Sequence, residues 1–349
     1  MVADRARPPI DKPCGEGLMP EGVAALHALG VWSDCAPSSA PFFGIRFAED
    51  GRYANGRFRG GQGAGIRRIE LHRRLIERAS AAGVTMRWNA TVRLGRGSGA
   101  ELDGRKVPAR WLIGADGRES AVRRAAGFAE IAQPARRAGL RRHFAIPAWS
   151  ELVEVHWHDA GQAVVTPLPS GEICVSAFAN RPGPKFADLI RLHPELNRRL
   201  AGARPTSEVR GAISGSSAVS SVARGRVLLI GDASGAVDAI TGQGLSLGFR
   251  QALALADALA ADDPARYQRA HRGFVRTARW MARLMLAAGA HRAWRRRLLD
   301  ALNGSPHLFD YMLGIHTGAA ALRNLPLGAI AGFCARLSAP RFFKEGSEA

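Results

Sequence analysis

The chain has 349 residues, of which 46% are hydrophobic and 23% charged, a balance that is typical of a folded protein with a large core and excludes dominant disorder. Four widely spaced cysteines without a CxxC pair, and no apolar run of ~18 residues, argue against a disulfide scaffold and a membrane-spanning helix and predict a reduced, cytoplasmic protein. The net charge of +19 comes mainly from 45 arginines, but the chain has no helix-turn-helix, zinc or RNP signature, so we predict no nucleic-acid partner.

Helices and short strands alternate through the first third of the chain. Apolar residues at helical spacing predict helices over 16–30 and 66–82, and the second helix places Ile69 and Leu71 on one face with arginines opposite. Further elements are strands within 41–60, over 84–92 and at 111–113, a hairpin turn over 95–105, and a flexible loop in the glycine-rich segment 60–65.

Apolar residues recur at every second position between residues 140 and 180. Four such segments, separated by proline and glycine, predict an antiparallel sheet: 142–146, 152–157, 163–168 and 173–177. Helix follows over 184–203, the apolar run 226–230 is typical of a buried parallel strand, and a long helix is expected over 244–261 before a helical C-terminus. This order indicates an α/β domain into which a second sheet is inserted.

Two glycine-rich turns that carry an acid follow buried strands. The first, Gly114–Arg123 (GADGRESAVR), contains Asp116, and the second, Gly231–Gly244 (GDASGAVDAITGQG), contains Asp232 and leads into a helix. An α/β sheet places ligand-binding groups on such turns, and the amides of a helix N-terminus can face an anionic or electron-rich group. A plain helix cap is the alternative, above all for the first turn, because Asp or Ser followed by Glu is a common helix start.

The two motifs resemble the downstream flavin signatures of the FAD-dependent monooxygenase and geranylgeranyl-reductase-like superfamily. Gly65–Ala79 (GIRRIELHRRLIERA), with Arg68, and Asp11–Gly17 (DKPCGEG), with Cys14, are similar to further family features in the same order along the chain. The resemblance covers about residues 1–265.

The resemblance implies an α/β fold with a Rossmann-like FAD-binding domain of the glutathione-reductase type, N-terminally incomplete, an inserted antiparallel-sheet substrate domain and a helical C-terminus. The implied division is 1–40, 66–135 and 205–264 for the FAD-binding domain, 41–65 and 136–204 for the substrate sheet, and 265–349 for the C-terminal helices.

The chain departs from the family at its start. Family members begin with a strand, a GxGxxG loop and a helix that hold the FAD pyrophosphate, whereas Val2–Asp4 resembles the end of the next strand, whose acid binds the adenosine ribose. Without the preceding unit we expect the chain as written to bind FAD weakly or to fold poorly; a flavin absorbance spectrum, compared with that of a chain extended upstream, would test this. Ala239 also stands where family members often have proline, so this loop is expected to be less rigid.

The resemblance assigns roles to single residues. Asp232 would meet the ribityl chain, the amides of Gly242–Gly244 would face the flavin pyrimidine edge, and Arg68 and Asp116 would lie near the pyrophosphate. The implied cofactor-binding residues are Asp4, Cys14, Gly15, Gly17, Arg68, Asp116, Gly117, Gly231, Asp232, Gly242, Gln243 and Gly244. The flavin itself would carry the redox chemistry, with NAD(P)H as the electron donor, so no catalytic residue is assigned.

The substrate, a small molecule, is expected to lie over the flavin and against the antiparallel sheet. Its candidate contacts are His143, His156, Trp157 and Thr166. Strand alternation puts His156 and His158 on one face and Trp157 on the other, without indicating which face is the pocket. A core or solvated position is the favoured interpretation for each histidine, so none is assigned as a general base. The scattered histidines indicate no metal site.

The last third of the chain combines arginines with apolar residues. Trp280, Met285 and Trp294 stand among arginines, and Arg295–Arg297 is the densest basic run. Basic amphipathic helices can lie on an acidic membrane surface, which would give the protein a weak peripheral membrane contact. The alternative that we favour is a helical cap whose apolar stripe covers the substrate domain.

The sequence therefore predicts an FAD-dependent oxidoreductase, most simply an NAD(P)H-dependent monooxygenase of an apolar or aromatic small molecule. A reductase of isoprenoid-like double bonds is the first alternative, favoured by the CGEG segment. A flavin-free protein with a binding or regulatory role is the second, because the glycine-loop unit does not precede Met1.

Overall fold

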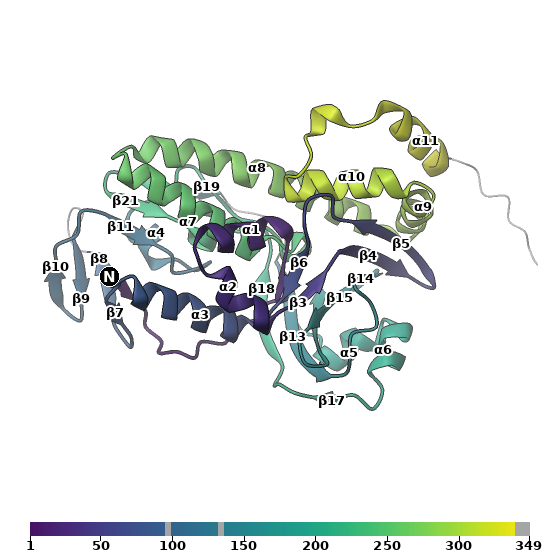
Figure 1. Ribbon diagram of the computed structural model, residues 1–349, viewed down its shortest axis with the longest axis horizontal. Coiled ribbons are helices and arrows are strands. Elements are labelled where there is room, and N and C mark those ends of the chain that lie inside the picture. Colours follow the sequence, from purple (N-terminus) through teal and green to yellow (C-terminus); the bar gives the residue numbers. More distant parts are fainter. Residues whose placement is uncertain (95–98, 132–135, 339–349) are drawn as a thin grey trace, which may run out of the picture.

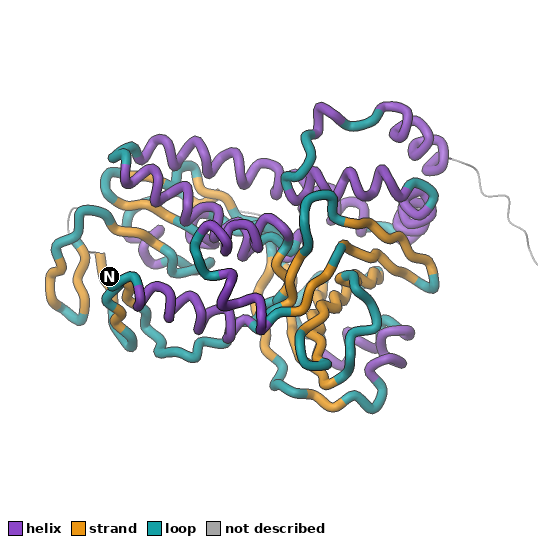
Figure 2. The backbone as a smooth tube through the Cα atoms, in the orientation of Figure 1, coloured by secondary structure: helices purple, strands orange, loops and turns teal. Residues whose placement is uncertain are grey.

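A computed structural model describes residues 1–94, 99–131 and 136–338. Figure 1 shows a smaller α/β region, with β11 and β21, at one end of the molecule and a large sheet at the other, with α7 and α8 running along the first region toward the second. In Figure 2 the strands of the large sheet lie side by side, with helices above and below them. The mixed α/β architecture expected from the alternating elements is confirmed.

The large sheet has eight strands and follows the predicted alternation. Its hydrogen-bonded order is β17 (Arg204–Pro205), β13 (Arg137–Ala145), β16 (Glu172–Ala179), β15 (Gly161–Leu168), β14 (Val153–His158), β4 (Gly44–Glu49) and β5 (Arg52–Arg57), and β18 (Arg210–Ser214) pairs with β13 as well. β13 to β16 pair antiparallel with one another, whereas β4 joins β14 in parallel. The strand β18, which the predicted division places with the FAD-binding domain, thus pairs within this sheet, and β17 lies across the predicted boundary between residues 204 and 205.

Short pairs of parallel strands form the end of the molecule opposite the large sheet. β1 (Val2–Ala3) pairs with β7 (Met86–Arg87), and β11 (Leu112–Gly114) pairs with β21 (Val227–Leu229), which β20 (Ala223–Arg224) extends. Leu228 and Leu229 are fully buried against α7 (Gly244–Ala260) and α8 (Pro264–Gly289). Since β11 and β21 are parallel neighbours, the two acid-bearing turns that follow them lie at the same edge.

Close packing turns part of the expected glycine loop into a strand, so that prediction is wrong for Gly63–Gly65. These residues form β6, which is buried between β2 (Gly17–Leu18) and β3 (Ala40–Phe42). A Cβ atom on Gly65 would lie 1.7 Å from the carbonyl oxygen of Pro167, so only glycine lets the backbones approach this closely.

Several predicted helix and strand boundaries change for local reasons. The helix expected over 16–30 begins only at Pro20, as α1 (Pro20–Ala28), because Gly17–Leu18 pairs in a sheet, and α2 (Trp32–Cys35) follows it. In α3 (Arg68–Ala81) Leu71 is buried, but Ile69 is 40% exposed, contrary to the predicted apolar face. Pro194 divides the helix expected over 184–203 into α5 (Phe186–Arg191) and α6 (Pro194–Leu200), since proline disfavours helical backbone in the residue before it.

The remaining strands are short. The strand expected over 84–92 is reduced to β7 and the start of β8 (Val92–Leu94), which pairs with the hairpin β9 (Ala100–Leu102) and β10 (Arg105–Val107); residues 95–98 of the expected turn lie outside the described residues. β12 (Glu130–Ile131) pairs with β19 (Ala218–Val219), and the short helix α4 (Ala121–Ala125) follows the first acid-bearing turn.

The C-terminal helices cover one face of the large sheet. α9 (Arg292–Asn303) and α10 (Pro306–Thr317) lie over β4 and β5, and α11 (Leu327–Ser338) lies against α9. Phe47 of β4 stacks on Trp157 of β14, with ring centroids 4.6 Å apart, and on Phe309 of α10 at 5.6 Å. Arg295, from the densest basic run, is buried and paired with Glu49 of β4. This arrangement is the helical cap that the sequence analysis favoured.

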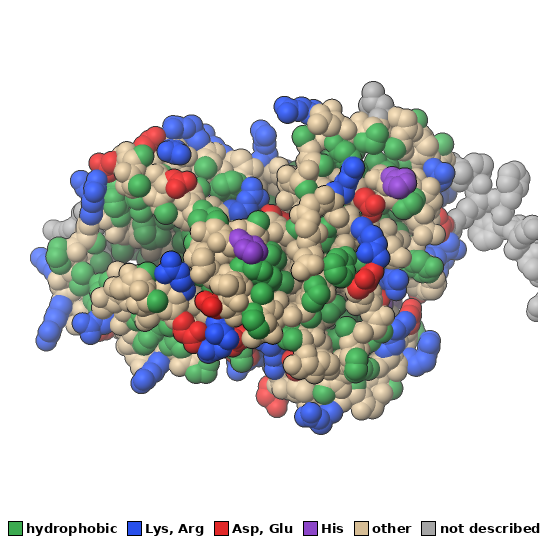
Figure 3. All heavy atoms as spheres, viewed as in Figure 1, with side chains coloured by type: hydrophobic (Ala, Val, Ile, Leu, Met, Phe, Trp, Pro, Cys, Tyr) green, Lys and Arg blue, Asp and Glu red, His purple; other side chains and the backbone are tan. Residues whose placement is uncertain are grey.

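The surface and the helices bear on the predicted membrane contact. On the face shown in Figure 3, basic side chains are spread around the surface, with acidic ones between them. Among the helices in the described ranges, none combines the length and apolar character needed to cross a bilayer.

Candidate functional site

A cavity of about 870 Å³ lies where the two acid-bearing turns, α7, the large sheet and the C-terminal helices meet. Of the twelve predicted cofactor-binding residues, eight line it: Cys14, Gly15, Gly17, Arg68, Gly231, Asp232, Gly242 and Gly244. The other four, Asp4, Asp116, Gly117 and Gln243, are not among its lining residues. Ala115 and Arg118 of the first turn line the cavity together with Asp232 of the second, so both turns contribute to one cleft.

The start of α7 forms a bare wall of this cavity. Gly242, directly before the helix, has a left-handed backbone (φ +63°), and a Cβ atom on Gly244 or Gly248 would meet no atom of the described residues within 4 Å. The N-cap residue Gln243 does not cap the helix with its side chain, which instead donates to the carbonyl oxygen of His316 at 2.6 Å. A flat ring can therefore approach the backbone here, and the first amides of α7 can face its electron-rich edge.

Asp232 and Arg68 bring opposite charges to the cavity. Asp232 lies in the turn after β21, where its side chain is accessible from the cavity but enclosed by protein, and this desolvation raises its pKa although Arg118 and Lys12 act in the opposite direction. Arg68 begins α3, and its buried Nη1 atom has no hydrogen-bond partner among the described residues. A buried guanidinium nitrogen without a partner suggests a ligand oxygen that is added on binding.

Asp116 lies beside the start of α4. Its carboxylate accepts hydrogen bonds from Ser120 Oγ at 2.5 Å and from the backbone N–H of Val122 at 3.1 Å, and Ser120 is the N-cap residue of α4. Asp4 directly follows β1 and accepts a hydrogen bond from the N–H of Ala6 at 2.9 Å. Local hydrogen bonds therefore engage both carboxylate oxygens of Asp116 and the Oδ1 atom of Asp4.

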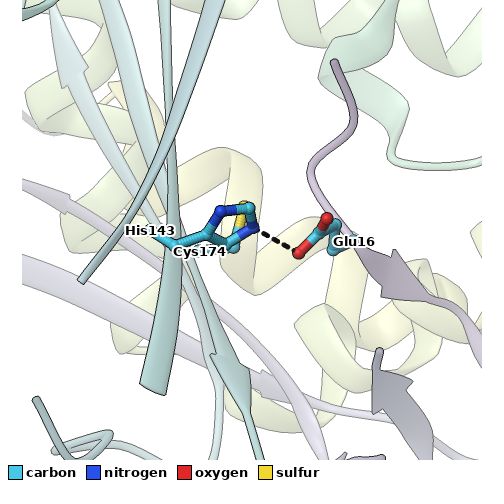
Figure 4. Close-up of side chains that lie close together, drawn as sticks. All are labelled: Glu16, His143 and Cys174. Carbon is cyan, nitrogen blue, oxygen red and sulfur yellow. Dashed lines mark hydrogen bonds and ion pairs between the residues drawn. The ribbon is translucent and has the colours of Figure 1, made fainter. Parts of the chain in front are cut away.

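A buried polar group that the sequence did not predict lies at the cavity wall. Glu16 lines the cavity in the loop before β2, with a left-handed backbone (φ +58°), and its Oε2 atom lies 2.6 Å from His143 Nε2 on β13. Its Oε1 atom accepts the N–H of Arg68 at 3.0 Å. Figure 4 shows the Glu16 carboxylate pointing at the His143 imidazole, with Cys174 of β16 beside the ring. The DKPCGEG motif pointed to this segment, but nothing local in the sequence pairs Glu16 with a residue of β13.

The side chains of Glu16, His143 and Cys174 are of types that can hold a metal, and their potential ligand atoms lie within 4.8 Å of one another. Cys174, however, donates its S–H to the carbonyl oxygen of Cys14 at 3.6 Å, and burial raises the pKa of this thiol well above its ordinary value. Burial also raises the pKa of the Cys14 thiol. The protonated thiol and the direct contact between carboxylate and imidazole favour a hydrogen-bonded group over a metal centre.

Two of the four predicted substrate contacts line the cavity. They are Trp157 and Thr166, whereas His143 and His156 are not among its lining residues. His156 lies on the opposite face of β14 with His158, as strand alternation predicted, and both rings contact His193 with centroids about 6 Å apart. Burial beside these two imidazoles lowers the pKa of His193 to about 3.

The far end of the cavity is apolar. It is lined by side chains of the C-terminal helices that meet Phe47 and Trp157 of the sheet, namely Met281, Leu284, Met285, Trp294, Leu298, Leu302, Phe309, Met312, Leu313 and Phe333. Two of them, Leu284 and Trp294, are 39% and 42% exposed.

The lining residues fit the flavin half of FAD. The bare start of α7, the carboxyl of Asp232 and the unpartnered Arg68 nitrogen meet at one end of a cavity whose other end is apolar. The fold and this site define the class of FAD-dependent oxidoreductases and monooxygenases.

The chain belongs to the family described as "FAD binding domain", whose model matches residues 1–266. It is 29% identical over 293 residues to a menaquinone reductase of Mycobacterium tuberculosis, covering 76% of this chain and 72% of that protein. It is 28% identical over 265 residues to the ubiquinone hydroxylase UbiL of Rhodospirillum rubrum, covering 68% and 59%. The crystal structure of p-nitrophenol 4-monooxygenase PnpA from Pseudomonas putida DLL-E4 matches with a TM-score of 0.77 at 19% identity, covering 91% and 90%.

Proposed function

We propose that the protein is an FAD-dependent monooxygenase that uses NAD(P)H and acts on an apolar molecule with an unsaturated ring and a hydrocarbon tail. The observation that carries this proposal is the shape of the site, in which a bare flavin-side wall continues into a pocket lined by apolar side chains of α8 to α11. Burial of a hydrocarbon tail gains roughly 0.8 kcal/mol per CH₂ group. The names of the relatives support this class of substrate, since menaquinone and ubiquinone are both quinones with isoprenoid tails.

Each part of the site has a role in this proposal. Asp232, Arg68 and the first amides of α7 would hold the cofactor, which when bound supplies two-electron redox chemistry. Trp157 and the apolar residues of the C-terminal helices would orient the substrate ring and exclude water from it. The predicted domain division and the assignment of Asp4 to the adenosine ribose are part of the same proposal.

Filling the apolar end tests this substrate class. Leu313→Trp, on α10, is expected to raise KM for a long-tailed quinone about tenfold or more, because the added volume competes with the tail, and to leave KM for a tail-less quinone nearly unchanged. Leu322→Trp, at a position that is 56% exposed and outside the cavity lining, is the matched control. Equal effects of Leu313→Trp on both quinones would contradict the proposal.

Reduction of an isoprenoid-like double bond is the second candidate, favoured by the Cys14–Gly17 segment at the cavity and by the name of the mycobacterial relative. Substrate-dependent oxygen uptake supports hydroxylation, whereas turnover with NAD(P)H under anaerobic conditions supports reduction. A chain that takes up no flavin under any condition would instead support the flavin-free alternative.

We also propose a weak peripheral membrane contact at the cavity mouth. Trp280 is 46% exposed one helical turn from Leu284 on α8, and Trp294 of α9 borders the same opening. Tryptophans and arginines at the opening of an apolar cavity suit a surface on which an apolar substrate arrives. Compared with wild type, the fraction of protein that sediments with acidic vesicles should fall in the Trp280→Ser/Trp294→Ser double variant and stay unchanged in Trp111→Ser. Equal sedimentation of wild type and both variants would contradict the membrane contact.

A further inference from the structure

A second, smaller cavity of about 240 Å³ adjoins the large one at the end of the sheet where β14 turns into β15. Trp157, Ile240 and Met285 line both cavities, so the small cavity lies beside the loop before α7 and the apolar C-terminal helices. Arg137, at the start of β13, and Gln162, near the start of β15, line the small cavity and are not among the lining residues of the large one. The residues assigned above to the cofactor include neither of them.

The sheet register brings these polar side chains together on one face. Trp157 and Gln162 are direct partners in the antiparallel pairing of β14 with β15, so their side chains lie side by side. Gln162 is also opposite Phe178 of β16, and the Arg137 guanidinium lies over the Phe178 ring at 5.4 Å from its centroid. Because Trp157 and Phe178 line the large cavity, the whole group projects from the face of the sheet that borders it.

Three buried donor atoms of this group have no hydrogen-bond partner among the described residues. They are Arg137 Nε, Trp157 Nε1 and Gln162 Nε2. The three residues are only 4% to 5% exposed, so bulk water does not replace the missing partner, which must lie within the enclosed space. Buried donors without an acceptor cost free energy, and native proteins keep them mainly where a ligand or an ordered water completes the site. Since all three atoms are N–H donors, the group that completes this site is an acceptor.

The charges around the donors favour a neutral acceptor over an anion. Arg137 Nη1 donates to the carboxylate of Asp238 at 3.1 Å, and both side chains are buried. The other polar lining residues, His158 and Asn180, are hydrogen-bonded to backbone groups of the turn between β14 and β15. The buried cation therefore already has its counter-ion, and an anion would bring an uncompensated charge into an enclosed space.

We propose that Arg137, Trp157 and Gln162 form a binding site for a ring carbonyl oxygen of the substrate, which we name the carbonyl site. This inference rests on the proposed function and specifies the polar end of its substrate. A carbonyl oxygen is neutral and has two lone pairs that accept N–H groups. With this oxygen in the small cavity, the ring lies against Ile240 beside the start of α7, and the tail extends toward the apolar end of the large cavity. A ring without an oxo group would leave the buried donors unpaired and bind less tightly.

The first test compares two ligands that share a tail. Calorimetric titration of the full chain uses a naphthoquinone and a naphthalene that carry the same isoprenoid tail, and wild type should bind the quinone about tenfold more tightly or better. Gln162→Met keeps the side-chain length and Trp157→Phe keeps an aromatic ring, but each removes one N–H donor. Each variant should weaken quinone binding about tenfold and leave naphthalene binding nearly unchanged. Gln62→Met, at an exposed position outside both cavity linings, is the matched control.

The second test reports on the carbonyl itself. In infrared difference spectra of the bound quinone, one carbonyl stretching band should move to lower frequency because of the hydrogen bonds, and the shift should shrink in Gln162→Met and in Trp157→Phe. Absence of quinone binding, an unshifted band in wild type, or the same preference for quinone over naphthalene in wild type and both cavity variants would overturn the carbonyl site. A shifted band without NAD(P)H-dependent turnover would refute the proposed function and leave the carbonyl site in place, whereas turnover with an unshifted band would do the reverse.

Discussion

Replacing Arg295 with methionine is expected to destabilise the protein by about 3–5 kcal/mol. The Arg295 side chain is 1% exposed and contacts both carboxylate oxygens of Glu49, Asp159 at 2.7 Å and the carbonyl oxygen of Gly289 at 2.9 Å. Methionine fills part of the volume but leaves the Glu49 carboxylate, which is 3% exposed, without its cation. Asp159, at 60% exposure, can be solvated again, so most of the loss arises from Glu49.

Denaturant unfolding followed by tryptophan fluorescence measures this loss. Arg297→Met changes the exposed neighbour in the same helix in the same way and should stay within about 0.5 kcal/mol of wild type. Adding Glu49→Leu to Arg295→Met removes the buried charge and should restore most of the lost free energy. If Arg295→Met behaves like Arg297→Met, or if the double variant is no more stable than the single one, the reasoning is refuted.

Three further predictions concern ionisable groups. Burial lowers the pKa of His271 to about 4, so between about pH 4 and 6.5 the unfolded chain binds a proton that the folded chain does not. The free energy of unfolding therefore falls as the pH drops through this window, and His271→Gln should reduce the slope of that free energy against pH by up to about 1.4 kcal/mol per pH unit. Identical slopes in the variant and wild type would count against the prediction. Burial raises the pKa of Glu21 to about 7, so its stabilising contribution is lost as the pH rises from 4.5 through 7. In paired urea titrations, the stability of Glu21→Gln relative to wild type should therefore be higher at pH 8 than at pH 5. An equal relative stability at both pH values would contradict the raised pKa. Iodoacetamide at pH 8 should modify the exposed Cys334 about tenfold faster or more than the half-buried Cys14 and the buried Cys174, whose raised pKa values keep them as thiols. Rapid loss of two thiols in mass spectra would refute this.

Local patterns in the sequence predicted the parts of the fold that depend on neighbouring residues. Alternation identified β13 to β16, and the two acid-bearing turns lie at one edge because each follows a parallel strand. The sequence pattern could not indicate that Gly65 is packed against Pro167, because glycine is depleted in strands and the contact is tertiary. Nor could it show that Arg295 belongs to the core, since its partner Glu49 is far away in the sequence.

The same distinction between local patterns and tertiary contacts applies to the residues of the candidate site. Motif residues such as Asp232 and Gly244 line the cavity, whereas Asp116, in an equally typical motif, is not among its lining residues and accepts the N–H of Val122 in the helix that follows it. The pairing of Glu16 with His143 joins a loop to a strand, and the apolar end comes from helices that carry no motif. Such contacts depend on how distant elements pack, which periodicity does not encode.

The pairing of β11 with β21 has a consequence for biosynthesis. The antiparallel strands between residues 137 and 179 can pair as soon as they leave the ribosome, but Leu112 must wait until Val227 has been translated. During that interval the apolar edge of β11 has no strand beside it, so the nascent chain is most in need of chaperone protection just before its cofactor-binding edge is complete.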